Sequence, residues 1–329
     1  MKKTIIGIAG NKTTTLELIN DLEEARISVD YLIHLTPLMA TDAAVSQYLD
    51  LRETAQARGI KVYHPKTYSL KSEEDRQNIT DLRIELLFVM GWQRLIPNWF
   101  LTQLKYGAYG MHGSSFPLPE GRGRSPMNWS LVEGRTEFVT HLFKYEPGID
   151  DGMIVGYQWF DINGWDTCET LHFKNRIAMS RLIKENLDKI INEEVSLQSQ
   201  VDRPPSYYHK RTWKDGIIPW EHSTMQIYNR VRAVTNPFPG AFTFDVDGGN
   251  KVMIWDAQPF DTRLCYDAVP GSIVEVLYNE QFVVKTGSDS LLVTSWTGKN
   301  WRPLKNKQFF TPPDFIPFLN RRGLHDLPG

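Results

Sequence analysis

The chain has 329 residues, of which 41% are hydrophobic, and a net charge of -2 at pH 7 with a pI near 6.5. This length allows a large buried core plus a smaller second domain, while the charge balance excludes a globally basic surface for nucleic acid or anionic membranes. Cys168 and Cys265 lack the spacing of a disulfide framework or thiolate metal site. These cysteines fit a reducing cytoplasm, and because no stretch approaches the roughly 20 apolar residues of a membrane span, we expect a soluble, cytoplasmic protein.

Predicted strands and helices alternate through the first 91 residues. Strands are expected over 4–9, 29–36, 60–65 and 84–91, and helices over 13–27, 43–59 and 72–83. This alternation predicts an α/β fold with a mostly parallel, Rossmann-like sheet. Ligands of such sheets bind beyond the carboxyl ends of the strands, so the loops after residues 10, 35, 65 and 91 are candidate site loops.

The sheet is expected to continue beyond residue 91. A short helix over 98–105 precedes a strand over 108–115, and residues 139–145 and 153–162 have the pattern of antiparallel additions. A long amphipathic helix is predicted over 167–192.

A polar, proline-rich stretch after Asn192 is typical of a linker, and it places a domain boundary near residue 205. We therefore divide the chain into a catalytic domain over 1–204 and a smaller domain over 205–329. After a helix over 223–235, the second domain alternates short apolar runs with turns, and the DGGN at 247–250 predicts a hairpin. The pattern favours a small antiparallel β barrel or sandwich.

One short segment, GMHGSSFPLPEGRGRSPMNWS at residues 110–130, concentrates turn-forming residues around a titratable ring. His112 ends a predicted strand near the same sheet edge as Gly91, and small neighbours leave its ring accessible. The segment lacks the serine elbow of a hydrolase and the lysine of a P-loop. General-base chemistry at His112 is therefore the hypothesis that the segment favours over a structural histidine.

A second segment, YEPGIDDGMIV at residues 145–155, follows the strand that begins just after this loop. Asp150 in its turn is placed to reach the imidazole of His112, which is the usual arrangement for a carboxylate that orients a general base. The alternative interpretation is an ordinary solvated turn.

Together these segments resemble the formyltransferases that use N10-formyltetrahydrofolate. That family carries Asn-x-His-x-Ser, a Leu-Pro turn, an Arg-Gly segment before Asn-Trp, and a Gly-x-Asp-x-Gly turn about 35 residues on; here the matching segments are MHGSSFPLPEGRGRSPMNWS and PGIDDG. HKRTWKDGIIPW and IYNRVRAVTNPFPGAFTF resemble the start of the OB-like domain of methionyl-tRNA and sugar formyltransferases. The resemblance covers nearly the whole chain and implies an OB-like fold for residues 205–329.

The resemblance assigns His112 as the base and Asp150 as its partner, but Gly110 stands where the family has a catalytic asparagine. That asparagine is expected to hydrogen-bond the formyl oxygen, and losing one such donor costs about 100- to 1000-fold in rate. A backbone N–H near Gly113, the side chain of Asn128, and His141 are the candidate replacements, and the sequence does not choose among them.

The resemblance also implies N10-formyltetrahydrofolate as cosubstrate and no metal. The folate is expected against Gly91, Trp92, Arg94 and Leu95 and near the turn of Asp150. For Trp92, a packing role in the core is as well supported by the sequence as a contact to folate.

The acceptor amine is the remaining question. Residues 34–50, where tRNA formyltransferases commonly carry a basic insertion, contain no lysine or arginine, which argues against a nucleic acid. Arg122 and Arg124, with Ser114, are suitably placed to bind the diphosphate of a sugar nucleotide, although both arginines could instead pair with surface carboxylates.

We therefore expect an N-formyltransferase acting on a dTDP- or UDP-linked amino sugar of bacterial surface polysaccharide, such as an O-antigen. The alternatives are a methionyl-tRNA formyltransferase and a catalytically impaired folate- or nucleotide-binding relative. Neither the sugar, the nucleotide nor the retention of turnover follows from the sequence. A homodimer is suggested by the resemblance alone, and the aromatic tail at 309–323 is expected to pack on its own domain or on a partner subunit.

Overall fold

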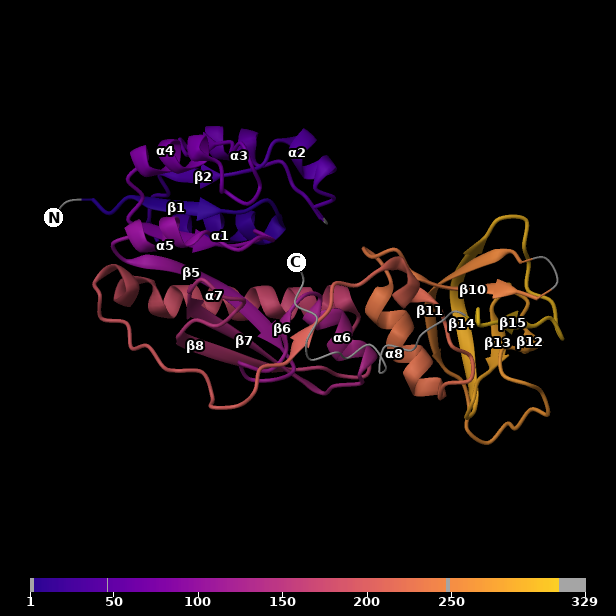
Figure 1. Cartoon of the computed structure of the whole chain (residues 1–329). Coiled ribbons are helices and arrows are strands. Elements are labelled where there is room, and N and C mark those ends of the chain that lie inside the picture. The colour runs from indigo at the N-terminus through magenta and orange to yellow at the C-terminus, as the bar shows by residue number, and fades with distance from the viewer. Residues whose placement is uncertain (1–2, 46, 247–248, 314–329) are drawn as a thin grey trace. The chain divides into compact units, whose positions relative to one another are not determined.

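The computed structural model describes residues 3–45, 47–246 and 249–313 (Figure 1). The chain divides into two compact units: the first comprises Met1–Arg122, Val139–Phe160 and Lys174–Pro205, and the second Gly123–Phe138, Asp161–Phe173 and Ser206–Gly329. The second unit thus includes two segments that precede the predicted domain boundary at residue 205. That boundary stays a prediction, and each unit is described by itself.

Seven of the described strands form one sheet in the order β3-β2-β1-β4-β5-β7-β8. Their bounds are β1 (Ile6–Ala9), β2 (Tyr31–Ile33), β3 (Lys61–Tyr63), β4 (Leu86–Val89), β5 (Gly107–Ser114), β7 (Glu137–Lys144) and β8 (Ile154–Asp161). The strands from β3 to β5 in this order pair in parallel, and β7 pairs antiparallel to β5. The predicted mostly parallel α/β sheet is confirmed.

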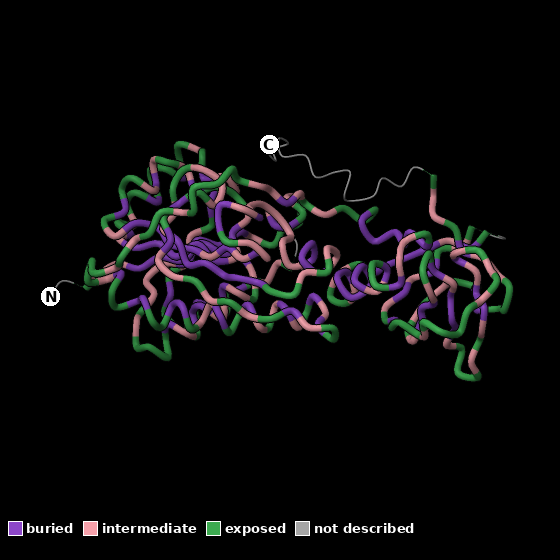
Figure 2. The backbone as a smooth tube through the Cα atoms, turned by 90° about the horizontal axis from the view of Figure 1, so that it is seen from below, coloured by how far each residue is buried: buried purple, intermediate pink, exposed green. Residues whose placement is uncertain are grey.

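Helices cover both faces of this sheet. Their bounds are α1 (Thr13–Glu24), α2 (Pro37–Asp42), α3 (Arg52–Ala57), α4 (Glu73–Asp81), α5 (Asn98–Gln103) and α7 (Cys168–Ile191). The apolar stripe of α1, which includes Leu18 and Leu22, packs with residues of α7 against one face, while α4 and α5 contribute Ile79 and Phe100 to the core on the other face. Figure 2 shows the buried backbone concentrated in the strands between these layers.

The single long helix predicted over 43–59 is wrong. Residues 43–45 and 47–51 are not helical, and only the short helices α2 and α3 flank them. Ala44 and Gln47 have positive φ angles of 47° and 57°, which no helix accommodates. The amide of Leu49 donates to the carbonyl of Asn11, and the Tyr48 hydroxyl donates to the carbonyl of Leu35. These bonds tie the segment to the ends of β1 and β2.

The second unit contains an antiparallel sheet in the order β12-β13-β14-β11-β10-β15. Its strands are β10 (Ala241–Asp245), β11 (Lys251–Pro259), β12 (Ile273–Val276), β13 (Phe282–Lys285), β14 (Ser290–Gly298) and β15 (Phe309–Phe310). The pairing of β10 with β11 confirms the predicted hairpin, although residues 247–248 of its turn lie outside the described residues. The predicted small β-rich, OB-like domain is thus confirmed. The aromatic tail was expected to pack on its own domain or a partner subunit, but most of it lies within residues 314–329, outside the described residues.

Helices α6 (Pro126–Val132) and α8 (Thr224–Val234), the 3-10 turn η1 (Trp213–Gly216), and the paired strands β6 (Arg122–Gly123) and β9 (Tyr207–Tyr208) complete the described elements. Helix α6 was not predicted, because its sequence follows a run of glycine, arginine and proline that is typical of a loop. In the part of the chain that the structure describes, no helix is both long enough and apolar enough to span a membrane.

Candidate active site

His112 lies near the end of β5, directly opposite His141 of β7 in the antiparallel ladder. Directly opposed residues project from the same face of a sheet, so the two imidazoles are neighbours. The His112 ring is almost buried, with 9% of the residue exposed. Its Nε2 lies 2.8 Å from the carbonyl oxygen of Gly121, and its Nδ1 lies 3.3 Å from Oδ2 of Asp150.

Asp150 sits in the turn between β7 and β8 with a positive φ of 49°, a conformation that aspartate tolerates better than most residues. Gln200 holds this turn from outside. Its side-chain amide donates to the carbonyl oxygens of Asp150 at 2.7 Å and Gly152 at 2.9 Å, and its Oε1 accepts from Nη2 of Arg122 at 2.7 Å. The carboxylate therefore reaches His112 from an anchored backbone.

The pair has the parts needed for proton transfer. Both ring nitrogens of His112 face oxygen atoms, and an imidazole can donate to two acceptors at once only when it carries two protons. The adjacent carboxylate of Asp150 supplies the negative charge that such an imidazolium needs. The geometry thus suits a ring that gains a proton during a reaction.

His141 is a different kind of histidine. It is 2% exposed, and its Nδ1 makes no hydrogen bond to any residue that the structure describes. Burial, and next the charge of His112, lower the pKa of His141 to about 4. The His141 ring is therefore neutral at pH 7.

The space beside Gly110 is already filled. A Cβ atom built on Gly110 would lie 2.4 Å from Cε2 of Tyr145 and 2.7 Å from the carbonyl oxygen of Val89. The Tyr145 ring stacks on Phe143 with centroids 5.0 Å apart. No side chain fits at position 110 without displacing either the ring or the backbone of β4.

The turn after β4 carries the residues expected to contact folate. Gly91 has a φ of +79°, and a Cβ there would lie 2.8 Å from Oγ1 of Thr15, so only glycine lets this turn approach the first turn of α1. Trp92 is buried and packs edge-on against Tyr68, which places it in the core, and its Nε1 makes no hydrogen bond to a described residue. Arg94 and Leu95 are exposed, and the Arg94 guanidinium lies over the Tyr68 ring.

The remaining expected site residues are engaged within the fold. The Ser114 hydroxyl donates to the carbonyl of Phe116, and Arg122 supports Gln200. Asn128 and Arg124 belong to the second unit: the Asn128 amide donates to the carbonyl of Ala233, and the Arg124 backbone N–H donates to the carbonyl of Tyr208. Catalytic or substrate-binding roles for these four residues stay predictions.

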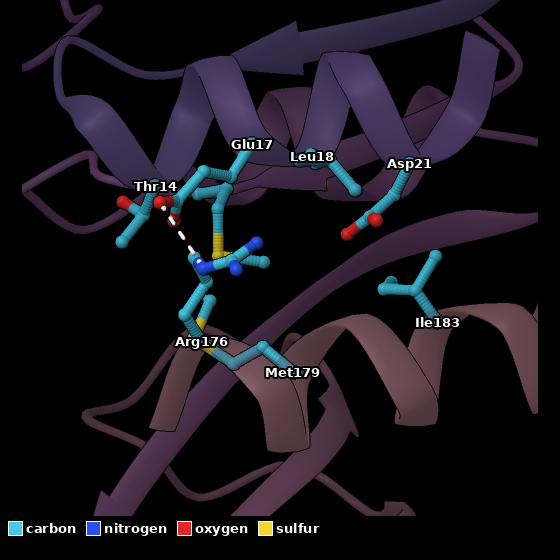
Figure 3. A pocket seen from close by; sticks show the side chains of 8 residues that line it. Thr14, Glu17, Leu18, Asp21, Arg176, Met179 and Ile183 are labelled. Atoms are coloured by element: carbon cyan, nitrogen blue, oxygen red, sulfur yellow. Dashed lines mark ion pairs between the residues drawn. The ribbon is translucent and has the colours of Figure 1, made fainter. Parts of the chain in front are cut away.

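A small hollow in the described residues lies elsewhere in the first unit, between α1 and α7. Figure 3 shows Glu17 of α1 paired with Arg176 of α7, at 3.5 Å between Oε1 and Nε. Burial raises the pKa of Glu17, although Arg176 opposes this shift. Neither His112 nor Asp150 lines the hollow.

Two family profiles match this sequence. The profile described as formyl transferase matches residues 2–186, more than half of the chain, and the one described as formyl transferase, C-terminal domain, matches residues 211–312. The chain belongs to the formyl transferase family. The resemblance inferred from the two short segments is confirmed, and this formyltransferase places His112 and Asp150 together as that resemblance requires.

Solved structures share the fold of this formyltransferase. An N-formyltransferase from Helicobacter canadensis in complex with folinic acid and dTDP-3-aminofucose is 18% identical, covering 88% of this chain and 98% of its own with a TM-score of 0.63. WlaRD, a sugar 3N-formyl transferase solved with dTDP and 5-N-formyl-THF, is 16% identical over 92% and 100% of the two chains, with a TM-score of 0.64. A methionyl-tRNA formyltransferase from Clostridium thermocellum is 16% identical over 78% and 94%, with a TM-score of 0.51.

Sequence reasoning missed Tyr145 and Gln200. Gln200 lies in a stretch that the composition marks as a linker, and nothing in that stretch signals its two bonds to the Asp150 turn. Tyr145 had a usable signal, because it is an aromatic residue five positions before Asp150 at the end of a strand.

Proposed function

We propose that this formyltransferase transfers the formyl group of N10-formyltetrahydrofolate to the primary amine of a nucleotide-linked amino sugar, with dTDP or UDP as the nucleotide. The observation that carries the proposal is the 3.3 Å approach of His112 Nδ1 to Asp150 Oδ2. A neutral amine that attacks a carbonyl carbon becomes acidic, and a base beside it must take the proton.

His112 supplies that base. The amine nitrogen bonds to the formyl carbon, the bond from that carbon to N10 breaks, and the proton that leaves the amine is taken by the ring and given to the leaving nitrogen. For this, Nε2 exchanges its contact with the Gly121 carbonyl for the amine. Gly121 has a φ of +70°, and a glycine there allows the backbone to shift at little cost. Asp150 meanwhile stabilises the charged ring.

The residues after β4 support binding of the folate at this turn. The indole N–H of Trp92 has no partner among the described residues, and it lies next to the backbone of the Gly91 turn in sequence, so both could bond a polar heterocycle. A buried polar group without a partner is costly, and a ligand that bonds it removes the cost. Trp92, Arg94 and the backbone of Gly91 are the residues that would hold the ring of the formyl donor.

The choice of an amino sugar over tRNA is supported by charge. Residues 34–50 contain no lysine or arginine, and the chain carries a net charge of -2. Binding of RNA relies on many phosphate contacts from basic side chains, whereas a sugar nucleotide needs only a few cations. Two relatives of this fold were solved with dTDP or a dTDP-linked amino sugar, which favours the same class of acceptor here.

The test is a turnover assay over a panel of dTDP- and UDP-linked amino sugars, with initiator Met-tRNA assayed alongside. We expect tetrahydrofolate release only when an amino sugar nucleotide is present, and none from the matched nucleotide sugars that carry hydroxyl in place of amine. Formylation of the tRNA alone would overturn the choice of acceptor. Binding of folate and nucleotide without turnover would identify an impaired relative instead.

A further inference from the structure

Tyr145 extends the pairing of β7 with β5 by one residue. Its backbone N–H donates to the carbonyl of Ala108 at 2.8 Å. Side chains of a strand alternate between the two faces of a sheet, so Tyr145 lies on the face of His141 and therefore of Gly110 and His112. The phenol ring thus belongs to the same side of the sheet as the proton acceptor.

The ring lies directly against Gly110. The Cζ atom of Tyr145, which carries the hydroxyl, is 3.2 Å from the position that a Cβ atom of residue 110 would take. Stacking on Phe143, with an interplanar angle of 17°, fixes the plane of the ring. The Tyr145 side chain therefore fills the volume that glycine leaves free two residues before His112.

The hydroxyl of Tyr145 is an available donor. It makes no hydrogen bond to any residue in the described ranges, whereas its neighbour Asp150 is already directed at His112. Burial, and next the negative charge of Asp150, raise the pKa of the phenol. The hydroxyl therefore keeps its proton at neutral pH and lies within the influence of the catalytic carboxylate.

We propose that the Tyr145 hydroxyl donates the hydrogen bond that stabilises the formyl oxygen while the amine attacks the formyl carbon. This inference rests on formyl transfer at the site of His112, as proposed above. Gly110 has no side chain to serve as donor, and the Tyr145 ring occupies the space that such a side chain would need. A donor aimed at an oxygen that gains negative charge accelerates a reaction by about 100- to 1000-fold.

The first test is Tyr145→Phe, which removes the hydroxyl and keeps the ring against Gly110. We expect kcat to fall about 100- to 1000-fold while KM for the amine changes little, because the hydroxyl bonds the formyl oxygen rather than the amine and this bond strengthens as the oxygen gains negative charge. Tyr109→Phe is the matched control, since it removes a hydroxyl from a buried tyrosine on the opposite face of β5 and should leave kcat unchanged. Normal kcat in Tyr145→Phe would overturn the proposal.

The second test does not depend on the acceptor. The affinities of the wild-type protein and of Tyr145→Phe are measured by calorimetry for 10-formyl-5,8-dideazafolate, a stable analogue of the formyl donor, and for 5,8-dideazafolate, which lacks the formyl group. We expect the variant to lose affinity for the formyl compound and to retain affinity for the other. Equal changes for both compounds would indicate a structural role for Tyr145 and refute the inference.

The two proposals fail separately. If the wild-type protein formylates none of the amino sugars, the proposed acceptor is wrong, yet the comparison of the two analogues still decides the role of Tyr145. If the amino sugars are formylated and the analogues show no difference between wild type and variant, the proposed function stands and the Tyr145 donor is wrong.

Discussion

Replacing Gly110 by alanine tests whether the Tyr145 ring and β4 leave room at this position. The new Cβ would lie 2.4 Å from Cε2 of Tyr145 and 2.7 Å from the Val89 carbonyl oxygen, whereas carbon atoms in good contact are about 3.5–4.0 Å apart. The ring can turn away, but Val89 is paired with Gly110 in the sheet and cannot yield without disturbing β4. Overpacking of this kind costs about 1–3 kcal/mol.

The cost of Gly110→Ala is measured by thermal unfolding followed by circular dichroism. At about 2–4 °C per kcal/mol for a domain of this size, we expect Tm to fall by roughly 2–12 °C. Gly156→Ala is the matched control, because Gly156 also lies in a strand but a Cβ there would meet Leu182 at an ordinary 3.4 Å. We expect Gly156→Ala to be neutral or slightly stabilising, since glycine in a strand costs about 0.5–1 kcal/mol relative to alanine.

Turnover of Gly110→Ala should fall together with stability, because the displaced ring carries the Tyr145 hydroxyl away from its site. The same reasoning applies to Gly110→Asn. If the missing asparagine limits the rate, as the sequence suggests, this change should raise activity; the structure predicts a loss, because the collision begins at Cβ. Wild-type stability and turnover in Gly110→Ala would refute the reasoning.

Three further predictions concern the surroundings of His112. His112→Gln and Asp150→Asn should each lower kcat by about 100- to 10,000-fold with an unchanged circular dichroism spectrum, and near-normal turnover in either would contradict the proton-transfer roles. Gln200→Leu removes two hydrogen bonds to the Asp150 turn and should lower the free energy of unfolding in urea by about 1–3 kcal/mol, so an unchanged midpoint would show that the turn needs no such anchor. Burial, and next the charge of His112, lower the pKa of folded His141 to about 4 from a usual value of 6.5, so between these pH values the unfolded chain binds the extra proton and stability rises with pH. The contribution is at most about 1.4 kcal/mol per pH unit. When the free energy of unfolding is measured by urea denaturation at each pH from 4 to 7, it should rise less steeply with pH in His141→Gln than in wild type. An identical rise in both proteins would contradict the burial of a neutral ring.

The parallel sheet could be predicted because each strand is a short apolar run followed by a helix of matching length. The sequence alone offers no reason to reject the helix predicted over 43–59. Its composition suits a helix, but Tyr48 and Leu49 gain hydrogen bonds to Leu35 and Asn11 that only the folded sheet brings within reach. Tertiary contacts of this kind override local propensity.

The approach of His112 to Asp150 could be predicted without the register of β5 against β7, because the turn of Asp150 follows the strand that comes after the His112 loop and the family motif contains both residues. The position of Tyr145 depends on that register. The chain between the two strands is long, and a slip of one residue would move every side chain of β7 to the other face. In the observed register Gly110 stands opposite Phe143, and Tyr145 packs over the glycine. In the sequence, Gly110 suggests that a catalytic side chain has been lost. In the fold, Gly110 is the residue that leaves room for the Tyr145 ring on the face of the sheet that carries His112.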